Sequence, residues 1–214
     1  MSDLTPEQLD EYHCRVPADY YDRGIQNNLF QWYWHKKRFK ILPEILSDVG
    51  SKVLDLGCHS GLLTAKIAGQ LKGSVMGLDI SELAIRYASR KYPQLDFRVA
   101  DIQKGIPFSD YSFEAVTAFD VLEHISNLEY VVSEIKRVLK PQGVLLMGIP
   151  NENLLFRTIW YFWTKTRGKV WQELHVHKFS DENLKQFFNS QGFKSIFDKK
   201  IHLGMYWIIK YQKV

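Results

Sequence analysis

The most constraining feature of this sequence is a short apolar run that contains the acid Asp55 and is followed by a glycine turn. The run is Val53–Leu56, and Gly57 and Gly61 frame the turn just before a helical pattern. Glycine lets the backbone come within hydrogen-bonding distance of a ligand where a Cβ atom would clash. The helix behind the turn directs free N–H groups and the positive end of its dipole toward the same place. The segment therefore predicts the first strand, loop and helix of an α/β ligand-binding domain.

Strand-like and helix-like segments alternate along the rest of the chain. Asn28 begins a long aromatic and basic helix that we expect to restart at Pro43, and Ser126 begins a capping box. Such alternation is typical of a mostly parallel sheet with helices on both faces. We expect helices before residue 50 and at 62–71, 81–92, 126–140 and 180–191, and strands at 53–56, 74–78, 96–100, 113–119, 143–149, 193–198 and 205–211.

The composition fits a globular domain and narrows the classes of function. The 214 residues are 45% hydrophobic, and no apolar run is long enough to cross a bilayer. The polar, acidic beginning does not have the pattern of a secretory signal, so we expect a cytoplasmic protein. A net charge of +4 is small for a dedicated nucleic-acid binder. Cys14 and Cys58 lie too far apart for a zinc or redox motif, and we interpret both as reduced thiols.

Four loop segments are expected to meet at one edge of the sheet. Right-handed crossovers bring the carboxyl ends of parallel strands together there, and ligands bind where the strand order reverses. This places Gly57–Gly61, Asp79, Asp101 and Asp120 around one cleft. Asp79 follows the second strand, where an acid can accept hydrogen bonds from the ribose of NAD, FAD or S-adenosylmethionine (SAM). Its other interpretation is an acid at a helix N-terminus beside Ser81.

The glycine turn disfavours a dinucleotide ligand. A pyrophosphate loop needs G-x-G-x-x-G, but this chain has His59 at the third position and Leu62 at the sixth. Asp55 would also repel a pyrophosphate, whereas it suits a ligand that carries positive charge. SAM carries an ammonium and a sulfonium group, and the turn therefore favours SAM.

With these residues the chain resembles the class I SAM-dependent methyltransferases, over about residues 20–214. Within that superfamily it is similar to small-molecule methyltransferases of quinone biosynthesis and natural-product tailoring. We accordingly expect a doubly wound α/β fold, with a mostly parallel seven-stranded sheet, helices on both faces and an antiparallel final strand. The chain would be one domain over residues 1–214, with N-terminal helices over about 1–50 and an insert over about 151–177 covering the cleft. The matching blocks are Val53–Gly61, Gly77–Ser81, Ala100–Ile102, Phe119–Ile125, Leu139–Leu146, Ile149–Asn151 and His175–Ser180.

The resemblance implies a role for each residue on the cofactor side. The glycine turn would pack against the methionine part of SAM, Asp79 would hold the ribose, and Asp101 would accept a bond from the adenine amino group. Lys37 or Arg38 would meet the SAM carboxylate. The family usually has a second glycine where this chain has His59. The expected cofactor-binding residues are Asp55, Gly57, Gly61, Asp79, Ile80, Asp101, Ile102 and Phe119.

The expected reaction is an in-line displacement at the sulfonium methyl group, with S-adenosylhomocysteine (SAH) as the product. Positioning supplies much of the acceleration, and a general base assists a weakly acidic hydroxyl. We select His124 as that base because it follows the fourth strand; its other interpretation is packing at the start of the next helix. His175 and His177 could bind a metal together with Glu173, but a structural or substrate contact suits so sparse a cluster better. We therefore expect no metal.

The insert is expected to shape the acceptor pocket. Residues 153–169 are aromatic and then basic, as in a lid, in an interfacial helix that makes transient contact with a membrane surface, or in a helix packed on the core. The N-terminal helices would form the opposite wall. The expected partner is a small apolar or aromatic acceptor, methylated on oxygen, with no nucleic acid and with the oligomeric state left open. The expected pocket residues are Trp34, Asn151, Trp160, His175 and His177.

Two other classes of function stay open at this point. A catalytically silent SAM-fold protein that acts as a binding or scaffolding partner would account for His59, although Asp55, Asp79 and Asp101 argue against it. A nicotinamide oxidoreductase is disfavoured by the missing glycines.

Overall fold

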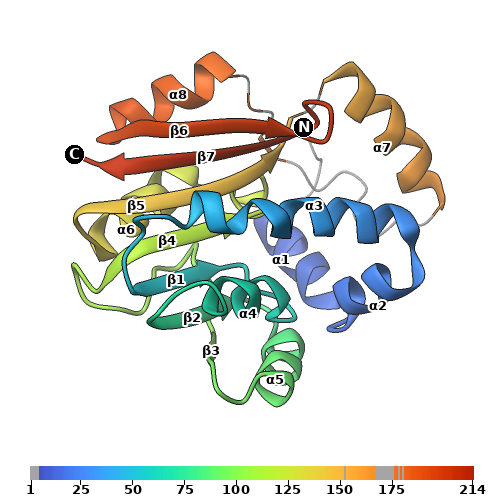
Figure 1. Ribbon diagram of the computed structural model, residues 1–214, viewed down its shortest axis with the longest axis horizontal. Helices are drawn as coiled ribbons and strands as arrows, with labels where there is room; N and C mark the ends of the chain where they lie inside the picture. Colours follow the sequence, from blue (N-terminus) through green and yellow to red (C-terminus); the bar gives the residue numbers. More distant parts are fainter. Residues whose placement is uncertain (1–4, 152, 167–175, 178, 180) are drawn as a thin grey trace.

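A twisted seven-stranded sheet forms the centre of the computed structural model, which describes residues 5–151, 153–166, 176–177, 179 and 181–214. The strand order is β3-β2-β1-β4-β5-β7-β6 (Figure 1). The strands are β1 (Lys52–Leu56), β2 (Ser74–Asp79), β3 (Asp96–Val99), β4 (Phe113–Phe119), β5 (Leu139–Pro150), β6 (Phe193–Ile201) and β7 (Tyr206–Lys213). The helices are α1 (Pro6–Arg15), α2 (Tyr20–Asn27), α3 (Leu29–Ile45), α4 (Leu62–Ala68), α5 (Glu82–Lys91), the single turn η1 (Leu122–His124), α6 (Leu128–Val138), α7 (Leu154–Thr166) and α8 (Asp181–Ser190).

The strand directions confirm the expected fold class. β3, β2, β1, β4 and β5 run parallel to one another, and β7 runs antiparallel to both β5 and β6. The chain moves outward from β1 to β3 on one side and then returns to pair β4 against the other side of β1. This reversal between β1 and β4 is the place where open α/β sheets bind their ligands.

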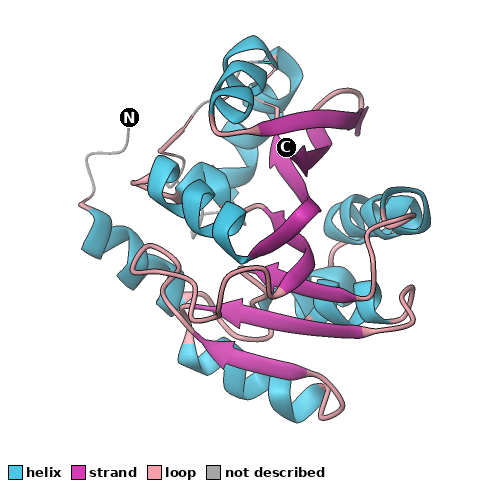
Figure 2. Cartoon of the chain, turned by 90° about the vertical axis from the view of Figure 1, so that its left-hand side faces the viewer, coloured by secondary structure: helices cyan, strands magenta, loops and turns pink. Residues whose placement is uncertain are grey.

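Helices cover both faces of the sheet, as the alternating pattern predicted (Figure 2). One face carries α6 and α8, whose buried Val131, Ile135 and Phe188 pack against β4, β5 and β7 in a continuous apolar cluster. On the other face, Ile45 of α3 and Ile67 of α4 pack against β1, β2 and β5. The two layers fix the strand ends that carry the candidate site.

Three local details differ from the sequence expectation. α3 continues through Pro43 instead of restarting there, because Ile41, Leu42 and Ile45 around it are buried against the sheet and outweigh the missing N–H donor. The N-cap of α6 is Asn127 and not Ser126, since the Asn127 side chain accepts a bond from the Tyr130 N–H. β5 begins at Leu139, several residues earlier than expected, and its register with β4 shifts between the pairs Phe113–Leu139 and Ala115–Val144. The predicted cap of α8 at Ser180 lies outside the described residues.

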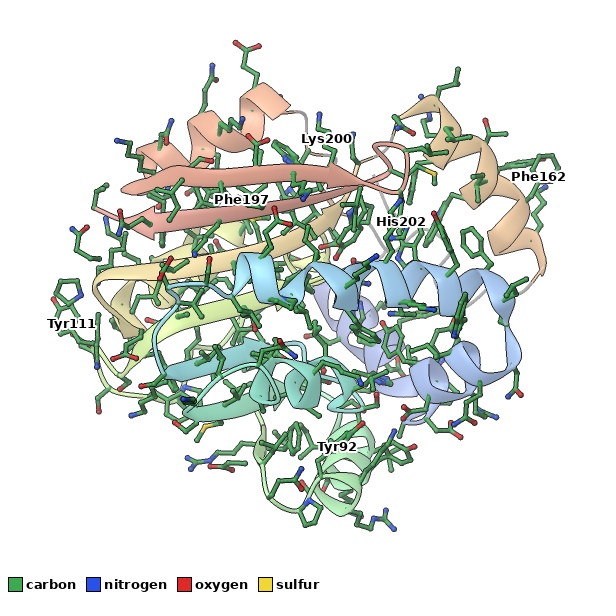
Figure 3. All side chains as sticks on the ribbon, in the orientation of Figure 1. Tyr92, Tyr111, Phe162, Phe197, Lys200 and His202 are labelled. Carbon is green, nitrogen blue, oxygen red and sulfur yellow. The ribbon has the colours of Figure 1, made fainter. Side chains whose placement is uncertain are left out.

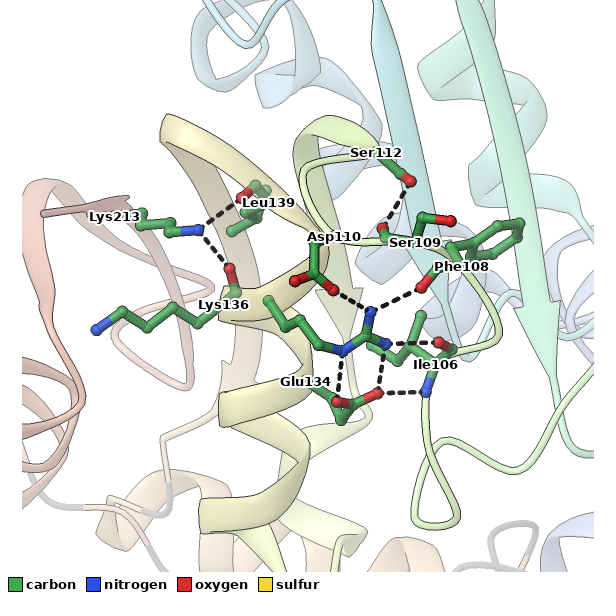
Figure 4. Close-up of polar contacts among 10 residues, drawn as sticks. Ile106, Phe108, Ser109, Asp110, Ser112, Glu134, Lys136, Leu139 and Lys213 are labelled. Carbon is green, nitrogen blue, oxygen red and sulfur yellow. Dashed lines mark hydrogen bonds and ion pairs between the residues drawn. The ribbon is translucent and has the colours of Figure 1, made fainter.

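An arginine on α6 fastens the loop that connects β3 to β4 (Figure 4). Arg137 donates hydrogen bonds to the carbonyl oxygens of Phe108 (2.7 Å) and Ile106 (2.9 Å) and pairs with Glu134 on its own helix. Glu134 in turn accepts the backbone N–H of Ile106 at 2.9 Å. A charge-assisted network of this kind holds the loop to the sheet with directional bonds.

The position of the α6 cap gives a testable prediction. Asn127→Ala removes the side-chain acceptor for the Tyr130 N–H, and we expect the free energy of unfolding to fall by about 1 kcal/mol. Ser126→Ala is the matched control, because Ser126 makes no capping bond, and it should leave stability nearly unchanged. Urea unfolding monitored by circular dichroism measures both. A larger loss for Ser126→Ala than for Asn127→Ala would contradict the capping assignment.

Candidate functional site

The turn after β1 has left-handed backbone at three positions. The φ angles are 65° at Gly57, 43° at His59 and 71° at Gly61. A Cβ atom on Gly57 would collide with the Val121 side chain, and one on Gly61 would lie 2.7 Å from the Phe97 ring. These two glycines are required by both conformation and space. His59 adopts the same backbone region although it carries a side chain, and its ring lies edge-on to Tyr21 with the centroids 5.0 Å apart.

Asp79 connects this turn to the end of β2. One of its carboxylate oxygens accepts the backbone N–H of His59 and the other accepts the N–H of Ser81, both at 2.8 Å. The Ser81 hydroxyl then caps α5 by accepting the Ala84 N–H. Each Asp79 oxygen has a further lone pair, so a carboxylate that orders the turn can also accept hydrogen bonds from a ligand.

A first cavity lies against the carboxyl ends of β1, β2, β3 and β4. It contains about 750 Å³ of space free of protein atoms, part of it open to solvent. That size suits a small-molecule or cofactor site. Asp101 at its edge accepts the Gln103 N–H at 2.9 Å and pairs with Lys104 at 2.9 Å. Its lining includes Gly57, His59, Asp79, Ile80, Ala100, Asp101, Ile102, Gln103 and Val121, with Asp10, His13 and Val16 from the N-terminal region.

A second cavity, of about 880 Å³ including space open to solvent, is predominantly aromatic. α2 and α3 form one wall and α7 forms the other (Figure 1). Tyr21, Asp120 and His124 line both cavities, so the two meet at the end of β4. The remaining lining residues are Tyr20, Phe30, Gln31, Trp34, His35, Arg38, Glu123, Pro150, Phe156, Ile159, Trp160 and Met205.

Some of the predicted pocket residues line this cavity and others do not. Trp34 and Trp160 line it from opposite walls. The Asn151 side chain instead donates to the Gly204 carbonyl at 2.7 Å and fastens the β6–β7 turn. The His177 ring nitrogen Nε2 lies 2.8 Å from the Ile125 carbonyl oxygen, outside the lining of the cavity. His175 lies outside the described residues.

Asp55 lies behind the glycine turn rather than in a cavity. It is 1% exposed, and its two carboxylate oxygens accept the hydroxyl groups of Thr64 and Thr117, both at 2.6 Å. Burial raises the pKa of this carboxyl to about 6, although the two threonine hydrogen bonds oppose the shift. The side chain therefore ties β1 to α4 and β4, and supports the turn from beneath.

A third and smaller cavity lies on the other side of the same turn. Phe119, Arg38 and the segment from Gly57 to Ser60 line it. The Arg38 guanidinium is 6% exposed overall and pairs with Asp120 at 2.7 Å, 4.5 Å from the centre of the Tyr206 ring. Of the two cations proposed for a carboxylate contact, Arg38 is the buried one, because Lys37 hydrogen-bonds Tyr33 at the surface.

Tyr21 and Glu123 are among the residues of the site that sequence reasoning missed. Tyr21 lines all three cavities, but nothing in its local sequence separates it from the neighbouring tyrosine. Glu123 lines the aromatic cavity and is 2% exposed. A signal for Glu123 was present, since it lies four residues after the end of the buried strand β4, and acids that follow strands at the ligand-binding edge are candidates on the same grounds as Asp79 and Asp101.

Comparison with known proteins agrees with this geometry. Residues 54–147 match the Methyltransferase domain family. A demethylmenaquinone methyltransferase from Lactobacillus johnsonii is 31% identical, over 95% of this chain and 92% of that protein. A mitochondrial ubiquinone biosynthesis O-methyltransferase from Mus musculus is 36% identical over 50% of this chain. The chain spans 30% of the length of the mouse protein, and 50% of a probable SAM-dependent methyltransferase from Mycolicibacterium smegmatis.

Solved structures show the same fold. The magnesium protoporphyrin IX methyltransferase of Synechocystis, determined with bound SAH, superimposes with a TM-score of 0.74 at 17% identity, over 98% of this chain and 100% of that one. The cyclase SpnF also reaches a TM-score of 0.74, at 15% identity, over 100% of this chain and 97% of its own. This likeness establishes the architecture, which hosts more than one chemistry.

This chain belongs to the class I SAM-dependent methyltransferases. Its first cavity fits SAM: the carboxylates of Asp79 and Asp101 retain lone pairs for hydroxyl and amino donors, and Gly57 leaves room beside the turn. The cofactor prediction is thereby confirmed at the level of the family.

The raised pKa of Asp55 predicts how stability depends on pH. The folded state holds this proton more tightly than the unfolded chain, so the free energy of unfolding should fall as pH rises from about 4 to about 6 and then level off. Asp55→Asn removes the titration and can still bond both threonines. Urea titrations across this range should show wild type losing stability relative to the variant, by about 1.4 kcal/mol per unit of pKa shift. A difference between the two proteins that stays constant with pH would contradict the prediction.

A second prediction concerns the cofactor cavity. Asp79→Ala should weaken SAH binding about 10- to 100-fold, because a charged acceptor is lost both to the ligand and to the turn. The protein should still fold, with a cooperative thermal transition. Asp96→Ala, which removes an exposed carboxylate paired with Arg98, is the control. Calorimetric titration with SAH measures each affinity; equal affinities in both variants would remove Asp79 from the binding site.

Proposed function

We propose that this protein transfers the methyl group of SAM to a hydroxyl oxygen of a small, apolar or aromatic acceptor. The observation that carries the proposal is the meeting of the two cavities at Tyr21, Asp120 and His124. A cofactor in the first cavity and an acceptor in the second would approach each other there. The aromatic lining of the second cavity favours a flat or apolar molecule. The names of the ubiquinone and demethylmenaquinone relatives are consistent with such an acceptor.

The cofactor would lie across the strand ends. We assign Asp79 and the adjacent Ile80 to the ribose, and Asp101 with the Ile102 backbone to the adenine. Gly57 would lie beside the methionine part. The first cavity contains all five of these residues. Gly61 and Asp55 would then act indirectly, by shaping and supporting the turn.

Arg38 and Phe119 would contact the other end of the cofactor. Both line the cavity on the far side of the glycine turn, which supports a role for Arg38 near the SAM carboxylate and for Phe119 as the floor beneath the amino group. Asp120, paired with Arg38, would present negative charge to that ammonium group. This arrangement pairs opposite charges at both poles of the amino acid part.

The chemistry is a single displacement, and SAM supplies a methyl group already activated by the positive sulfur. The walls of the two cavities need only hold an acceptor oxygen in line with the methyl–sulfur bond, which positioning alone can accelerate greatly. His124 lies where the cavities meet and is 9% exposed. We propose it as the general base that removes the hydroxyl proton. The proposal includes no metal.

Apolar acceptors would reach the cavity from its outer rim. Leu154, Tyr161 and Phe162 on α7 are exposed, and Phe162 points away from the rest of the molecule (Figure 3). Leu29 and Tyr33 at the start of α3 are exposed as well. Among the described residues, no helix is long and apolar enough to span a membrane. We propose that the segment 153–169 makes transient contact with a membrane surface, as amphipathic helices with basic flanks do.

Incubation with methyl-labelled SAM and a panel of phenols, aromatic carboxylates and aromatic amines, followed by mass spectrometry, tests the function. We expect labelled methyl ethers of phenols. Transfer to carboxylates or amines alone would contradict O-methylation of a hydroxyl. Tight SAH binding without transfer to any compound of the panel would favour a silent SAM-binding protein.

The base assignment has its own prediction. His124→Ala should lower the rate of transfer to the best phenol about 10²- to 10⁴-fold, because the proton acceptor is lost. Its affinity for SAH should stay within a few-fold of wild type. His202→Ala, which removes a buried histidine outside the lining of both cavities, controls for the loss of a buried ring. Wild-type turnover by His124→Ala would reject the assignment.

A further inference from the structure

Glu123 is a buried acid whose carboxylate has no hydrogen-bond partner among the described residues. It is 2% exposed, and neither carboxylate oxygen has a hydrogen-bond partner among the described residues. A buried polar group left without a partner costs free energy, and a buried charge costs more. Asp55 shows the usual solution, since each of its carboxylate oxygens accepts a threonine hydroxyl. The unsatisfied state of Glu123 therefore needs an explanation.

The backbone around Glu123 is held firmly. Its carbonyl oxygen accepts the N–H groups of Val176 (2.9 Å) and His177 (3.1 Å), and the neighbouring Leu122 is fully buried in the core. The His177 ring donates to the Ile125 carbonyl at 2.8 Å. A side chain on so constrained a turn stays in place beside the cavity, and the geometry of a bound ligand would depend on it.

Arg38 and Asp120, the charged residues that act on Glu123, do not provide a partner for its carboxylate. Arg38 pairs with Asp120 at 2.7 Å rather than with Glu123. Burial, followed by the negative charge of Asp120, raises the pKa of the Glu123 carboxyl well above its usual value, while the backbone N–H of Glu123 itself and then the positive charge of Arg38 oppose this. The group is thus ready to carry a proton, and a carboxyl in that state both donates and accepts.

We propose that Glu123 is the residue that recognises the acceptor, by hydrogen-bonding a neutral aromatic or enolic hydroxyl that enters the aromatic cavity. This inference rests on the proposed function and names the substrate class of the same site. A hydroxyl is the simplest group that both donates and accepts, so it pairs with the carboxyl in either protonation state. The surrounding Trp34, Phe156 and Trp160 would hold the ring that bears the hydroxyl.

The same contact distinguishes acceptor from product. Glu123 would accept the single hydroxyl proton when the acceptor binds, and His124 would remove that proton during transfer. Methylation then leaves an ether oxygen that can no longer donate. The product would leave Glu123 with an unsatisfied oxygen, and a site built to bond a hydroxyl discriminates strongly against an analogue without it. Recognition by Glu123 would therefore favour product release as well as acceptor choice.

Binding of two probes tests the proposal without any need for turnover. 2-Naphthol carries the hydroxyl, and 2-methoxynaphthalene is its methyl ether. With the enzyme saturated by SAH, equilibrium dialysis should show the naphthol binding at least about tenfold more tightly than the ether. Equal affinities, or no binding of naphthol, would overturn the proposal. Failure of the wild type to bind SAH would instead overturn the proposed function, so the two failures are distinguishable.

Variants then assign the discrimination to one side chain. Glu123→Leu should reduce the naphthol-to-ether ratio to near one while keeping SAH affinity and the melting temperature, since it replaces an unpartnered polar group with an apolar one. Glu123→Gln, which retains a donor and an acceptor, should preserve most of the ratio. Glu129→Leu, an exposed carboxylate on α6, is the control. A wild-type ratio in folded Glu123→Leu overturns the assignment, as does its loss in Glu129→Leu. If Glu123→Leu does not fold, the naphthol-to-ether affinity ratios of the wild type and of Glu123→Gln still test the proposal.

Discussion

The close approach of the glycine turn to the end of β4 is the constraint on which this site depends. Gly57 passes so near to Val121 that a Cβ atom cannot be accommodated, and the turn has left-handed backbone at Gly57, His59 and Gly61. Asp79 holds that backbone by accepting the His59 N–H. The family usually has glycine where this chain has His59. Here the hydrogen bond to Asp79 and the ring contact with Tyr21 hold a side chain in a conformation that glycine would adopt freely.

The cofactor side of the site can be predicted from sequence because its residues are identified by their position next to a strand end. Each residue of the first cavity that is assigned to SAM lies within a few positions of a strand end, and parallel strands bring such ends to one edge. Gly57, Asp79, Asp101 and Ile102 could therefore be placed together before their contacts were known. The role of Asp55 could not, because its burial depends on Thr64 and Thr117 from two other elements. A strand-end acid looks the same in sequence whether it faces a ligand or a pair of hydroxyl groups.

The acceptor side follows from sequence much less well. Its walls come from α2, α3 and α7, which lie far apart in the chain and meet only through tertiary packing. Aromatic composition predicted Trp34 and Trp160 in general terms. The sequence also predicted Asn151 and His177 as pocket residues, whose side chains instead bond the backbone carbonyls of Gly204 and Ile125. Polar residues near a cleft often serve to satisfy the backbone groups of the loops that form it, and sequence does not separate these two uses.

The hydrogen bonds of two buried acids distinguish a residue that supports the glycine turn from one that is proposed to bind the acceptor. Asp55 and Glu123 are both almost completely buried, and burial raises the pKa of each carboxyl. Each oxygen of Asp55 accepts a hydroxyl group of the protein, and its side chain lines none of the three cavities described above. Those of Glu123 have no partner among the described residues, and the side chain borders an aromatic cavity. Folded proteins rarely leave a buried polar group without a hydrogen-bond partner. We therefore infer that the partner of the Glu123 carboxyl is a hydroxyl group of the bound acceptor.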